Sequence, residues 1–257
     1  MSRLIGNDLT SGYGGEPILS GLDVNIPDGS LTVIVGPNAC GKSTLLRTMS
    51  RLLKPGSGHV MLDGKDIHRL SSRQVATTMG LLPQSSIAPD GITVTDLVGR
   101  GRYPHQSVFS QWSRRDQEAV GEALAVTGIT DLAKRHVDEL SGGQRQRVWI
   151  AMVLAQETPI LLLDEPTTFL DIAHQVEVLQ LVERLRRDGR TIVAVLHELN
   201  HAARFGTHLI AMRDGRIVAE GDPCDVLTAQ RVEEVFDMPA RVIADPDTGA
   251  PIVLPRI

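Results

Sequence analysis

Residues 36–43 have the sequence GPNACGKS, in which glycines, a lysine and a serine stand at fixed intervals. The segment fits the pattern G-x-x-x-x-G-K-[ST], whose glycines let backbone N–H groups turn inward around phosphate oxygens. The N-terminus of a following helix adds positive potential, Lys42 can reach the outer phosphates, and the Ser43 hydroxyl can hold Mg²⁺. The pattern predicts a nucleotide-binding phosphate loop made of Gly36, Pro37, Asn38, Ala39, Cys40, Gly41, Lys42, Ser43 and Thr44.

Two carboxylates, Asp164 and Glu165, directly follow the apolar run at residues 160–163. Charged groups at the end of a buried strand are costly unless they have partners, and Mg²⁺ and water would be such partners. Asp164 can then serve the Mg²⁺ shell, while Glu165 is placed to polarise an attacking water. A strand that simply ends in solvated acids is the alternative, and the phosphate loop upstream argues against it. The pair predicts hydrolysis of the bound nucleotide.

The segment LSGGQ at residues 140–144 precedes an apolar helical pattern. Ser141 is a good N-cap, and the two glycines expose amides at the start of the helix, which makes an anion site. Between the phosphate loop and the acidic strand end, this segment resembles the signature of the ABC ATPase family, whose members sandwich two ATP molecules between head-to-tail domains. The resemblance implies that ATP held by one copy is contacted by the other copy through Ser141, Gly142, Gly143, Gln144 and Asp171.

Other positions resemble functional residues of the same family. Tyr13 is similar to the aromatic residue that stacks on adenine, although a lone tyrosine near an N-terminus is often simple packing. Gln84 resembles the Q-loop glutamine, which contacts Mg²⁺ and water, and His197 resembles the switch histidine, which touches the γ-phosphate. Residues 168–171 stand at the D-loop position. The resemblance implies a catalytic set of Glu165, His197, Lys42 and Gln84, and a Mg²⁺ site of Ser43, Gln84 and Asp164.

Residues 197–201, HELNH, also fit the H-E-x-x-H pattern of zinc peptidases. That pattern needs both histidines on one helix face at i, i+4 spacing. His197 follows the β-branched run 191–196, so we expect it at a strand end and not on a helix with His201. A zinc peptidase is therefore disfavoured, and we interpret His201 as a surface histidine.

The two cysteines, Cys40 and Cys224, are too few for a disulfide framework, so we expect both to be free thiols. Cys40 lies in the phosphate loop, where a helix dipole could lower its pKa and expose it to oxidation. It could equally be a small residue that fills space, and we favour that interpretation.

The elements around these residues alternate between strands and helices. The β-branched run 31–35 leads into the phosphate loop and then into a helical pattern at 43–53. Apolar residues recur at helical spacing along 171–187, on a face that includes Ile172 and Leu179. Further strands are expected at 59–62, 79–82, 160–163, 191–196 and 208–212. The order predicts an α/β fold, by resemblance a P-loop NTPase of ABC type, with a mostly parallel central sheet and an N-terminal antiparallel β part.

We expect a single ABC ATPase domain with an inserted helical part. Residues 85–157 contain helical patterns at 94–99, 114–127 and 141–156 and no convincing strand, so they are interpreted as a helical subdomain. The α/β core would then comprise residues 1–84 and 158–237, and residues 238–257 would form a C-terminal β extension. Turn residues at 213–216 and 245–249 predict two hairpins.

The charge balance disfavours a nucleic-acid-binding protein, and the hydropathy excludes a membrane-spanning one. The chain has 26 basic and 31 acidic residues, so it offers no overall attraction to nucleic acid or to an anionic membrane surface. Its longest apolar runs, 148–155 and 191–196, are far shorter than the roughly 20 residues of a membrane span. The N-terminus lacks the apolar run of a secretory signal. We expect a cytoplasmic protein, which the resemblance would put at the cytoplasmic face of the inner membrane as a peripheral subunit.

Within the family, residues 99–106, 111–113 and 165–175 are most similar to the ATPases of bacterial ferric-siderophore importers, with vitamin B12 and haem importers as close relatives. The resemblance implies a second copy of the chain, membrane permease subunits and, indirectly, a substrate-binding protein as partners. Ala39 and Glu198 depart from the glycine and aspartate that relatives often carry, and neither change removes a group assigned to chemistry. Soluble ABC ATPases of DNA repair or translation are the alternative, but long heptad coiled coils and a second phosphate loop are absent.

The permease is expected to contact the region around residues 84–111, between the Q-loop and the first long helix of the helical subdomain. Tyr103, Phe109 and Trp112 are conspicuous there because aromatic residues make up only 3% of the chain. Concentrated aromatics suggest an interface. Packing in the core of the helical subdomain is an equally good interpretation and stays open at this point.

Overall fold

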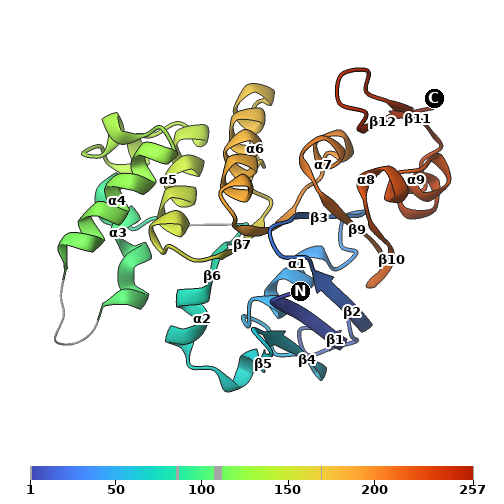
Figure 1. Ribbon diagram of the computed structural model, residues 1–257, viewed down its shortest axis with the longest axis horizontal. Coiled ribbons are helices and arrows are strands. Elements are labelled where there is room, and N and C mark those ends of the chain that lie inside the picture. Colours follow the sequence, from blue (N-terminus) through green and yellow to red (C-terminus); the bar gives the residue numbers. More distant parts are fainter. Residues whose placement is uncertain (1, 85–86, 107–111, 169, 257) are drawn as a thin grey trace. The chain divides into compact units, whose positions relative to one another are not determined.

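The computed structural model describes residues 2–84, 87–106, 112–168 and 170–256 (Figure 1). The chain divides into two compact units. Unit 1 comprises Met1–Leu70 and Arg186–Ile257, and unit 2 comprises Ser71–Leu185. Unit 1 contains the predicted phosphate loop and His197, whereas unit 2 contains the acidic strand end and the LSGGQ segment. The candidate site residues are therefore shared between the two units.

One sheet of unit 1 is antiparallel, and its polar and apolar residues alternate. Along β2 (Leu19–Ile26), Leu22 and Val24 are buried while Asp23 and Asn25 are exposed, as expected of a strand covered on one face. The strand order is β2-β1-β4-β5, with β1 (Leu4–Ser11), β4 (Ser57–Leu62) and β5 (Lys65–Asp66). The predicted N-terminal antiparallel part is confirmed.

Four further strands of unit 1 follow the order β10-β9-β3-β8. All residues of β3 (Leu31–Val35) and β8 (Thr191–Val195) are buried, which is typical of parallel strands covered on both faces. β3 is parallel to β8 and to β9 (His208–Arg213). β9 and β10 (Arg216–Gly221) form the predicted antiparallel hairpin, whose turn residues Asp214 and Gly215 have φ of 47° and 73°. Positive φ at both positions matches the twist that a two-residue hairpin turn requires.

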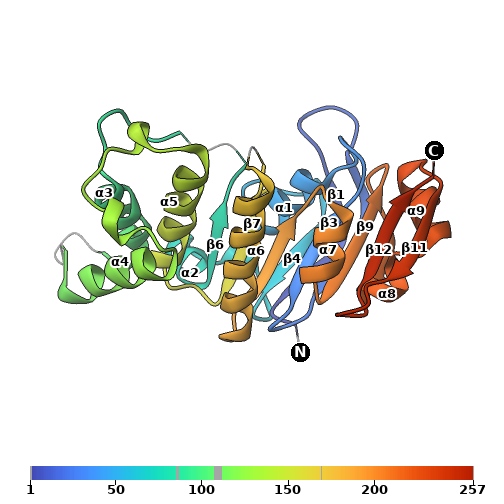
Figure 2. The same ribbon diagram turned by 90° about the horizontal axis from the view of Figure 1, so that it is seen from above.

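Helices and a terminal hairpin complete unit 1. Asn200 on α7 holds the hairpin, because its Oδ1 accepts from Val253 N at 2.8 Å and its Nδ2 donates to Val253 O at 3.4 Å. Figure 2 shows β11 and β12 side by side next to α8 and α9. The elements are α1 (Lys42–Met49), η1 (Ile67–Arg69), α7 (Leu199–Phe205), α8 (Pro223–Val226), α9 (Ala229–Phe236), β11 (Ala240–Ala244) and β12 (Pro251–Pro255).

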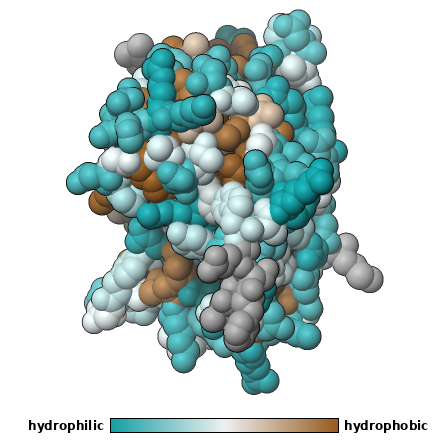
Figure 3. Space-filling view, turned by 90° about the vertical axis from the view of Figure 1, so that its left-hand side faces the viewer, coloured by the Kyte–Doolittle hydropathy of each residue, from teal (hydrophilic) through white to brown (hydrophobic). Residues whose placement is uncertain are grey.

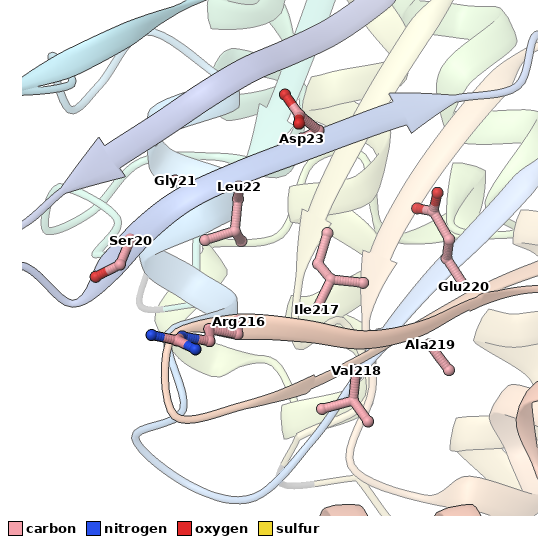
Figure 4. A pocket seen from close by; sticks show the side chains of 9 residues that line it. All are labelled: Ser20, Gly21, Leu22, Asp23, Arg216, Ile217, Val218, Ala219 and Glu220. Atoms are coloured by element: carbon pink, nitrogen blue, oxygen red, sulfur yellow. The ribbon is translucent and has the colours of Figure 1, made fainter.

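A cleft of about 510 Å³ lies between the outer strands β2 and β10 of unit 1. Ser20–Asp23 line one side and Arg216–Glu220 the other, as Figure 4 shows. None of the candidate nucleotide residues lines it. The cleft is thus separate from the phosphate loop.

Unit 2 pairs two parallel strands, β6 (Met79–Leu82) and β7 (Ile160–Asp164), with a group of helices. Serines start three of these helices with capping boxes, at Ser71, Ser113 and Ser141. Each serine oxygen accepts from the third helical N–H, and the side chain at that third position bonds back to the serine N–H. The helices are α2 (Ser72–Thr78), α3 (Val94–Gly99), η2 (Arg100–His105), α4 (Arg114–Val126), η3 (Thr130–Leu132), η4 (Val137–Glu139), α5 (Gly142–Ala155) and α6 (Ile172–Arg187).

A buried ion network joins η2, α4 and the end of α5. Arg102 Nε donates to Asp116 Oδ1 at 2.8 Å, and Arg102 Nη1 donates to Glu157 Oε2 and to Ala155 O, each at 2.6 Å. Burial opposes the charged form of Asp116, but hydrogen bonds from Ser113 and Arg102 outweigh it and lower the carboxyl pKa to about 2. The buried charges of Arg102 and Asp116 therefore compensate each other inside unit 2.

Most predicted elements are confirmed within one or two residues, and β6 and α3 have the predicted bounds. Two expectations are corrected. The helix predicted at 43–53 ends at Met49, since Arg51 has a left-handed φ of 66° that a helix cannot continue through. Ile172, assigned to the apolar face of α6, is 75% exposed, and the buried face of that helix starts at Val178. The predicted division at 84/85 and 157/158 stays a prediction.

Candidate nucleotide site

The phosphate loop connects β3 to α1 and is closed by its own lysine. Lys42 is 5% exposed, and its Nζ donates to Gly36 O and to Pro37 O, each at 2.8 Å. An ammonium group has three N–H donors, so these bonds account for two of them. The loop is thus held in a ring around a positive charge, which is the electrostatic environment that a phosphate group needs.

The backbone of this loop adopts conformations that favour glycine. Gly41 has φ of 103° and Ala39 has φ of 62°. No side chain caps α1 at its N-cap, Gly41. A Cβ at Gly36 would lie 2.2 Å from Met212 O, so only glycine fits that position. Ala39 stands where family members often carry glycine. Its left-handed backbone conformation therefore costs about 1 kcal/mol more than it would for glycine.

Cys40 is buried at the back of the loop. Burial raises the pKa of its thiol, while the nearby positive charge of Lys42 opposes that shift. Its Sγ would lie 2.7 Å from a Cβ at Gly36, so the thiol fills the space that this glycine leaves. A buried thiol with a raised pKa is a poor nucleophile, which favours the space-filling interpretation over redox chemistry. Cys224 is exposed and also a free thiol.

Tyr13 and His197 are the other candidate residues of unit 1. Tyr13 is 56% exposed, and its hydroxyl accepts from Arg47 Nη1 at 3.1 Å, so it is not a residue of a packed core. His197 is exposed just after β8. Because Ile34 on β3 pairs with Val195 on the parallel β8, the phosphate loop and His197 leave the sheet at the same edge.

The zinc pattern does not match the helix that it would need. α7 begins at Leu199 with Glu198 as its N-cap, so His197 precedes the helix that carries His201. The two histidines therefore lack the i, i+4 relation on one helix that the zinc-peptidase site requires.

In unit 2 the acidic strand end has an unusual backbone. Asp164 is the last residue of β7 and is 2% exposed. Glu165 has φ of 55°, and its Oε2 accepts from the Thr168 hydroxyl at 3.0 Å. A left-handed glutamate is strained, and such strain is concentrated at functional sites. The sequence placed Thr168 in the predicted D-loop but did not predict its hydrogen bond to Glu165, although its place three residues after Glu165 suits a turn contact.

Gln84 lies on the same side of unit 2 as the two carboxylates. Leu82 on β6 pairs with Leu163 on the parallel β7, so Gln84, which follows β6, and Asp164, which ends β7, lie at the same ends of neighbouring strands. Gln84 is exposed. The sheet thus brings together an amide and two carboxylates at one edge.

The LSGGQ segment starts α5 as predicted. Ser141 Oγ accepts from Gln144 N at 3.3 Å, and Gln144 Oε1 accepts from Ser141 N at 3.1 Å. Ser141 and Gly142 are exposed, whereas Gly143 is buried. Asp171 is exposed, and hydrogen bonds from the backbone and side chain of His174 lower its carboxyl pKa. Phe169, within the predicted D-loop, lies outside the described residues.

The three residues expected to bind Mg²⁺ all offer oxygen donors: the Ser43 hydroxyl in unit 1, and the Gln84 amide and the Asp164 carboxylate in unit 2. Mg²⁺ prefers such donors, keeps several waters and is usually bound by one or two carboxylates together with substrate phosphates. Among the described residues, no three His, Cys, Asp or Glu side chains are grouped as an all-protein metal cage would require. The residues fit a Mg²⁺ that arrives with a nucleotide.

The aromatic residues of the expected permease surface are exposed where they are described. Tyr103 is 62% exposed and Trp112 is 50% exposed, so neither belongs to the core of unit 2. Trp112 lies over Gly99, where a Cβ would approach its ring to 3.0 Å. Phe109 and Gln111 lie outside the described residues. Figure 3, a view from the side of α4, shows apolar patches among hydrophilic side chains.

Comparison with known proteins identifies the class to which this site belongs. A family model described as ABC transporter matches residues 19–168. The chain is 55% identical over 256 residues to the ferric enterobactin transport ATP-binding protein of Escherichia coli K12, covering 99% of this chain and 94% of that relative. It is 48% identical over 255 residues to the iron(3+)-hydroxamate import ATP-binding protein of Bacillus subtilis 168, covering 99% and 95%.

A solved structure with the same fold is the dimeric, post-hydrolysis ATP-binding cassette MJ0796 bound to ADP and Pi. It is 29% identical with a TM-score of 0.75, and the match covers 85% of this chain and 98% of that chain. The chain belongs to the ABC transporter family, and it is an ATPase subunit of that family. The resemblance inferred from the two glycine-rich motifs is confirmed.

Proposed function

We propose that this chain is the ATP-hydrolysing subunit of a bacterial importer that takes up iron(III)–siderophore complexes. The observation that carries the proposal is the 55% identity to a ferric enterobactin transport ATP-binding protein along nearly the whole of both chains. No helix among the described residues is long and apolar enough to cross a membrane. The chain would then act as a peripheral subunit at the cytoplasmic face of the cell membrane.

In each copy, ATP would be held by unit 1. Lys42 has one N–H beyond the two that it gives to the loop, and this donor would meet the outer phosphates. The amides at the start of α1, which no side chain caps at Gly41, would receive phosphate oxygens. Tyr13 would stack on adenine, since its exposed ring offers a face for the base.

Hydrolysis would use groups that lie at the C-terminal ends of parallel strands in both units. Glu165 would accept a proton from the attacking water, and its bond from the Thr168 hydroxyl would hold the carboxylate in one orientation. His197 would donate to the γ-phosphate. Ser43, Gln84 and Asp164 would hold Mg²⁺, which neutralises charge on the phosphates when bound.

The working unit would be a pair of copies. Ser141, Gly142, Gly143, Gln144 and Asp171 would contact the ATP of the other copy. Since Ser141 Oγ already accepts from Gln144 N, its own hydroxyl hydrogen is oriented away from that bond and can be donated to a phosphate. The exposure of Ser141 and Gly142 supports this role.

Permease subunits would contact the exposed aromatic residues Tyr103 and Trp112. Aromatic side chains are enriched in protein interfaces because they bury a large area at a low entropic cost. Arg102 directly precedes Tyr103 and Asp116 follows Trp112 by four residues, so the buried Arg102–Asp116 pair would hold together the segments that carry the two aromatic residues. A substrate-binding protein would deliver the cargo to the permease and would contact this chain only indirectly.

Glu165→Gln tests the ATPase assignment. The variant should bind ATP and form dimers, while phosphate release falls by at least about 100-fold, because a general base typically contributes that much. Glu233→Gln, an exposed position on α9, is the matched control. Undiminished hydrolysis in Glu165→Gln would contradict the role of Glu165.

Uptake tests the cargo. Cells lacking the ATPase of an iron(III)–siderophore importer would be given this chain with the permease encoded beside its gene, and accumulation of radiolabelled ferric siderophore and of cobalamin would be compared. Accumulation of the siderophore that Glu165→Gln abolishes is the expected result. Accumulation of cobalamin alone would contradict siderophore import and leave the ATPase assignment intact.

A further inference from the structure

His174 lies against a glycine of the LSGGQ segment. A Cβ built on Gly143 would lie 2.9 Å from His174 Cδ2, 3.1 Å from Cγ and 3.4 Å from Nε2. The imidazole therefore occupies the space that a side chain at Gly143 would need. This contact explains why Gly143 is buried while its neighbours Ser141 and Gly142 are exposed.

The same ring is held from its other side by the D-loop. His174 Nδ1 and Asp171 Oδ1 are 2.7 Å apart, and His174 N donates to the same oxygen at 2.9 Å. The Asp171 carboxylate can only accept, so Nδ1 carries the proton in this pair. Asp171 thus fixes the orientation of the His174 ring, and the ring packs against Gly143.

Two further contacts join α5 to the segment from β7 to α6. Gln146 Nε2 donates to Pro166 O at 2.8 Å, and Arg147 forms an ion pair with Glu177. Both lie further along α5 than Gly143, so the His174 contact is the one at the N-terminal end of the helix. There the ring lies between Gly143 and Asp171 and contacts both.

We propose that His174 is a positioning residue that holds the LSGGQ amides and Asp171 at the spacing required by the ATP of the second copy. This inference rests on the proposed pairing of two copies. ATP binding within one copy uses the phosphate loop, which His174 does not touch among the contacts described. Loss of the ring should therefore weaken the association of two ATP-loaded copies and leave the affinity of a single copy for ATP unchanged.

The experiment measures ATP-driven dimerisation in a Glu165→Gln background, where ATP persists, by sedimentation over a range of protein concentrations. His174→Ala should raise the dimer dissociation constant about tenfold, while ATP affinity at dilute, monomeric concentrations changes by less than about twofold. His59→Ala, an exposed histidine on β4, is the control and should change neither quantity.

Two conservative variants separate the ring from its hydrogen bond. His174→Phe keeps a ring over Gly143 but cannot donate to Asp171, and His174→Asn keeps a donor for Asp171 but has no ring. Each should recover part of the loss, with Phe recovering more. Full recovery by Asn would mean that only the hydrogen bond to Asp171 matters and that the ring has no positioning role, which overturns the inference.

The remaining outcomes are also decisive. ATP-driven dimerisation that His174→Ala leaves unchanged would overturn the inference alone. A chain that binds ATP in the Glu165→Gln background but never associates would overturn the proposed pairing and the inference together. A loss of ATP affinity in the monomer equal to the loss in dimerisation would show a general structural defect and would also overturn it.

Discussion

The helices α1 and α5 both begin with glycine-rich segments, yet their first turns are completed in different ways. At α1 the N-cap is Gly41, no side chain caps the helix there, and the loop closes around the buried Lys42. At α5 the N-cap is Ser141, and Gln144 completes a capping box. The start of α1 therefore relies on the charge of Lys42, whereas the start of α5 has a reciprocal pair of hydrogen bonds of its own.

Removal of Lys42 should have the largest effect among the substitutions at these two helix starts. Lys42→Ala should lower kcat/KM for ATP hydrolysis about 1,000-fold, the upper range for loss of one preorganised donor, since it removes both the loop closure and the charge facing the phosphates. Steady-state phosphate release measures the effect. Lys54→Ala, at an exposed position after α1, is the control. Activity within tenfold of the unaltered chain would mean that the loop does not depend on its lysine.

The capping box of α4 provides a pH test, because its third residue is the buried Asp116. The folded-state pKa of about 2 lies below the ordinary value, so ionised Asp116 contributes about 2 kcal/mol above pH 4. That contribution should fall away as the pH drops from about 4 towards 2. Chemical unfolding of the chain and of Asp116→Asn across this range measures it. A stability difference between the two that is independent of pH there would contradict the role of the buried pair.

Ser141→Ala should have the smallest effect on stability. Loss of an N-cap side chain costs about 1 kcal/mol, and the later part of α5, from Val148, is mostly buried and stays packed. Thermal unfolding measures the cost, with Ser20→Ala on the exposed edge of β2 as the control. A variant as stable as the control would mean that the α5 start is not held by its capping box, and the contrast with α1 would disappear.

The sequence predicted the elements well because their signals are local. Periodicity and turn residues gave β6, α3 and both hairpins, and the cap residue before GGQ predicted the start of α5. The end of α1 was missed, because nothing in its apolar pattern indicates the left-handed backbone at Arg51.

The candidate site was predicted as a set of residues but not as a set of contacts. The Thr168 bond to Glu165 and the ring of His174 over Gly143 depend on side-chain directions that spacing alone does not encode. The left-handed φ of Glu165 could not be predicted from the sequence either, since glutamate rarely adopts that conformation. Motif patterns identify the groups, and packing decides how firmly each is held.

The β9–β10 hairpin has a further consequence for the phosphate loop. Gly215 N, in the hairpin turn, donates to Cys40 O at 3.0 Å, and a Cβ at Gly215 would lie 1.9 Å from Ile18 O. Exchange of this amide with solvent requires the hairpin turn and the loop to separate. The hydrogen-exchange rate of the Gly215 amide therefore reports how often the phosphate loop opens. It can be measured without any substitution, and a ligand that keeps the loop closed should slow it.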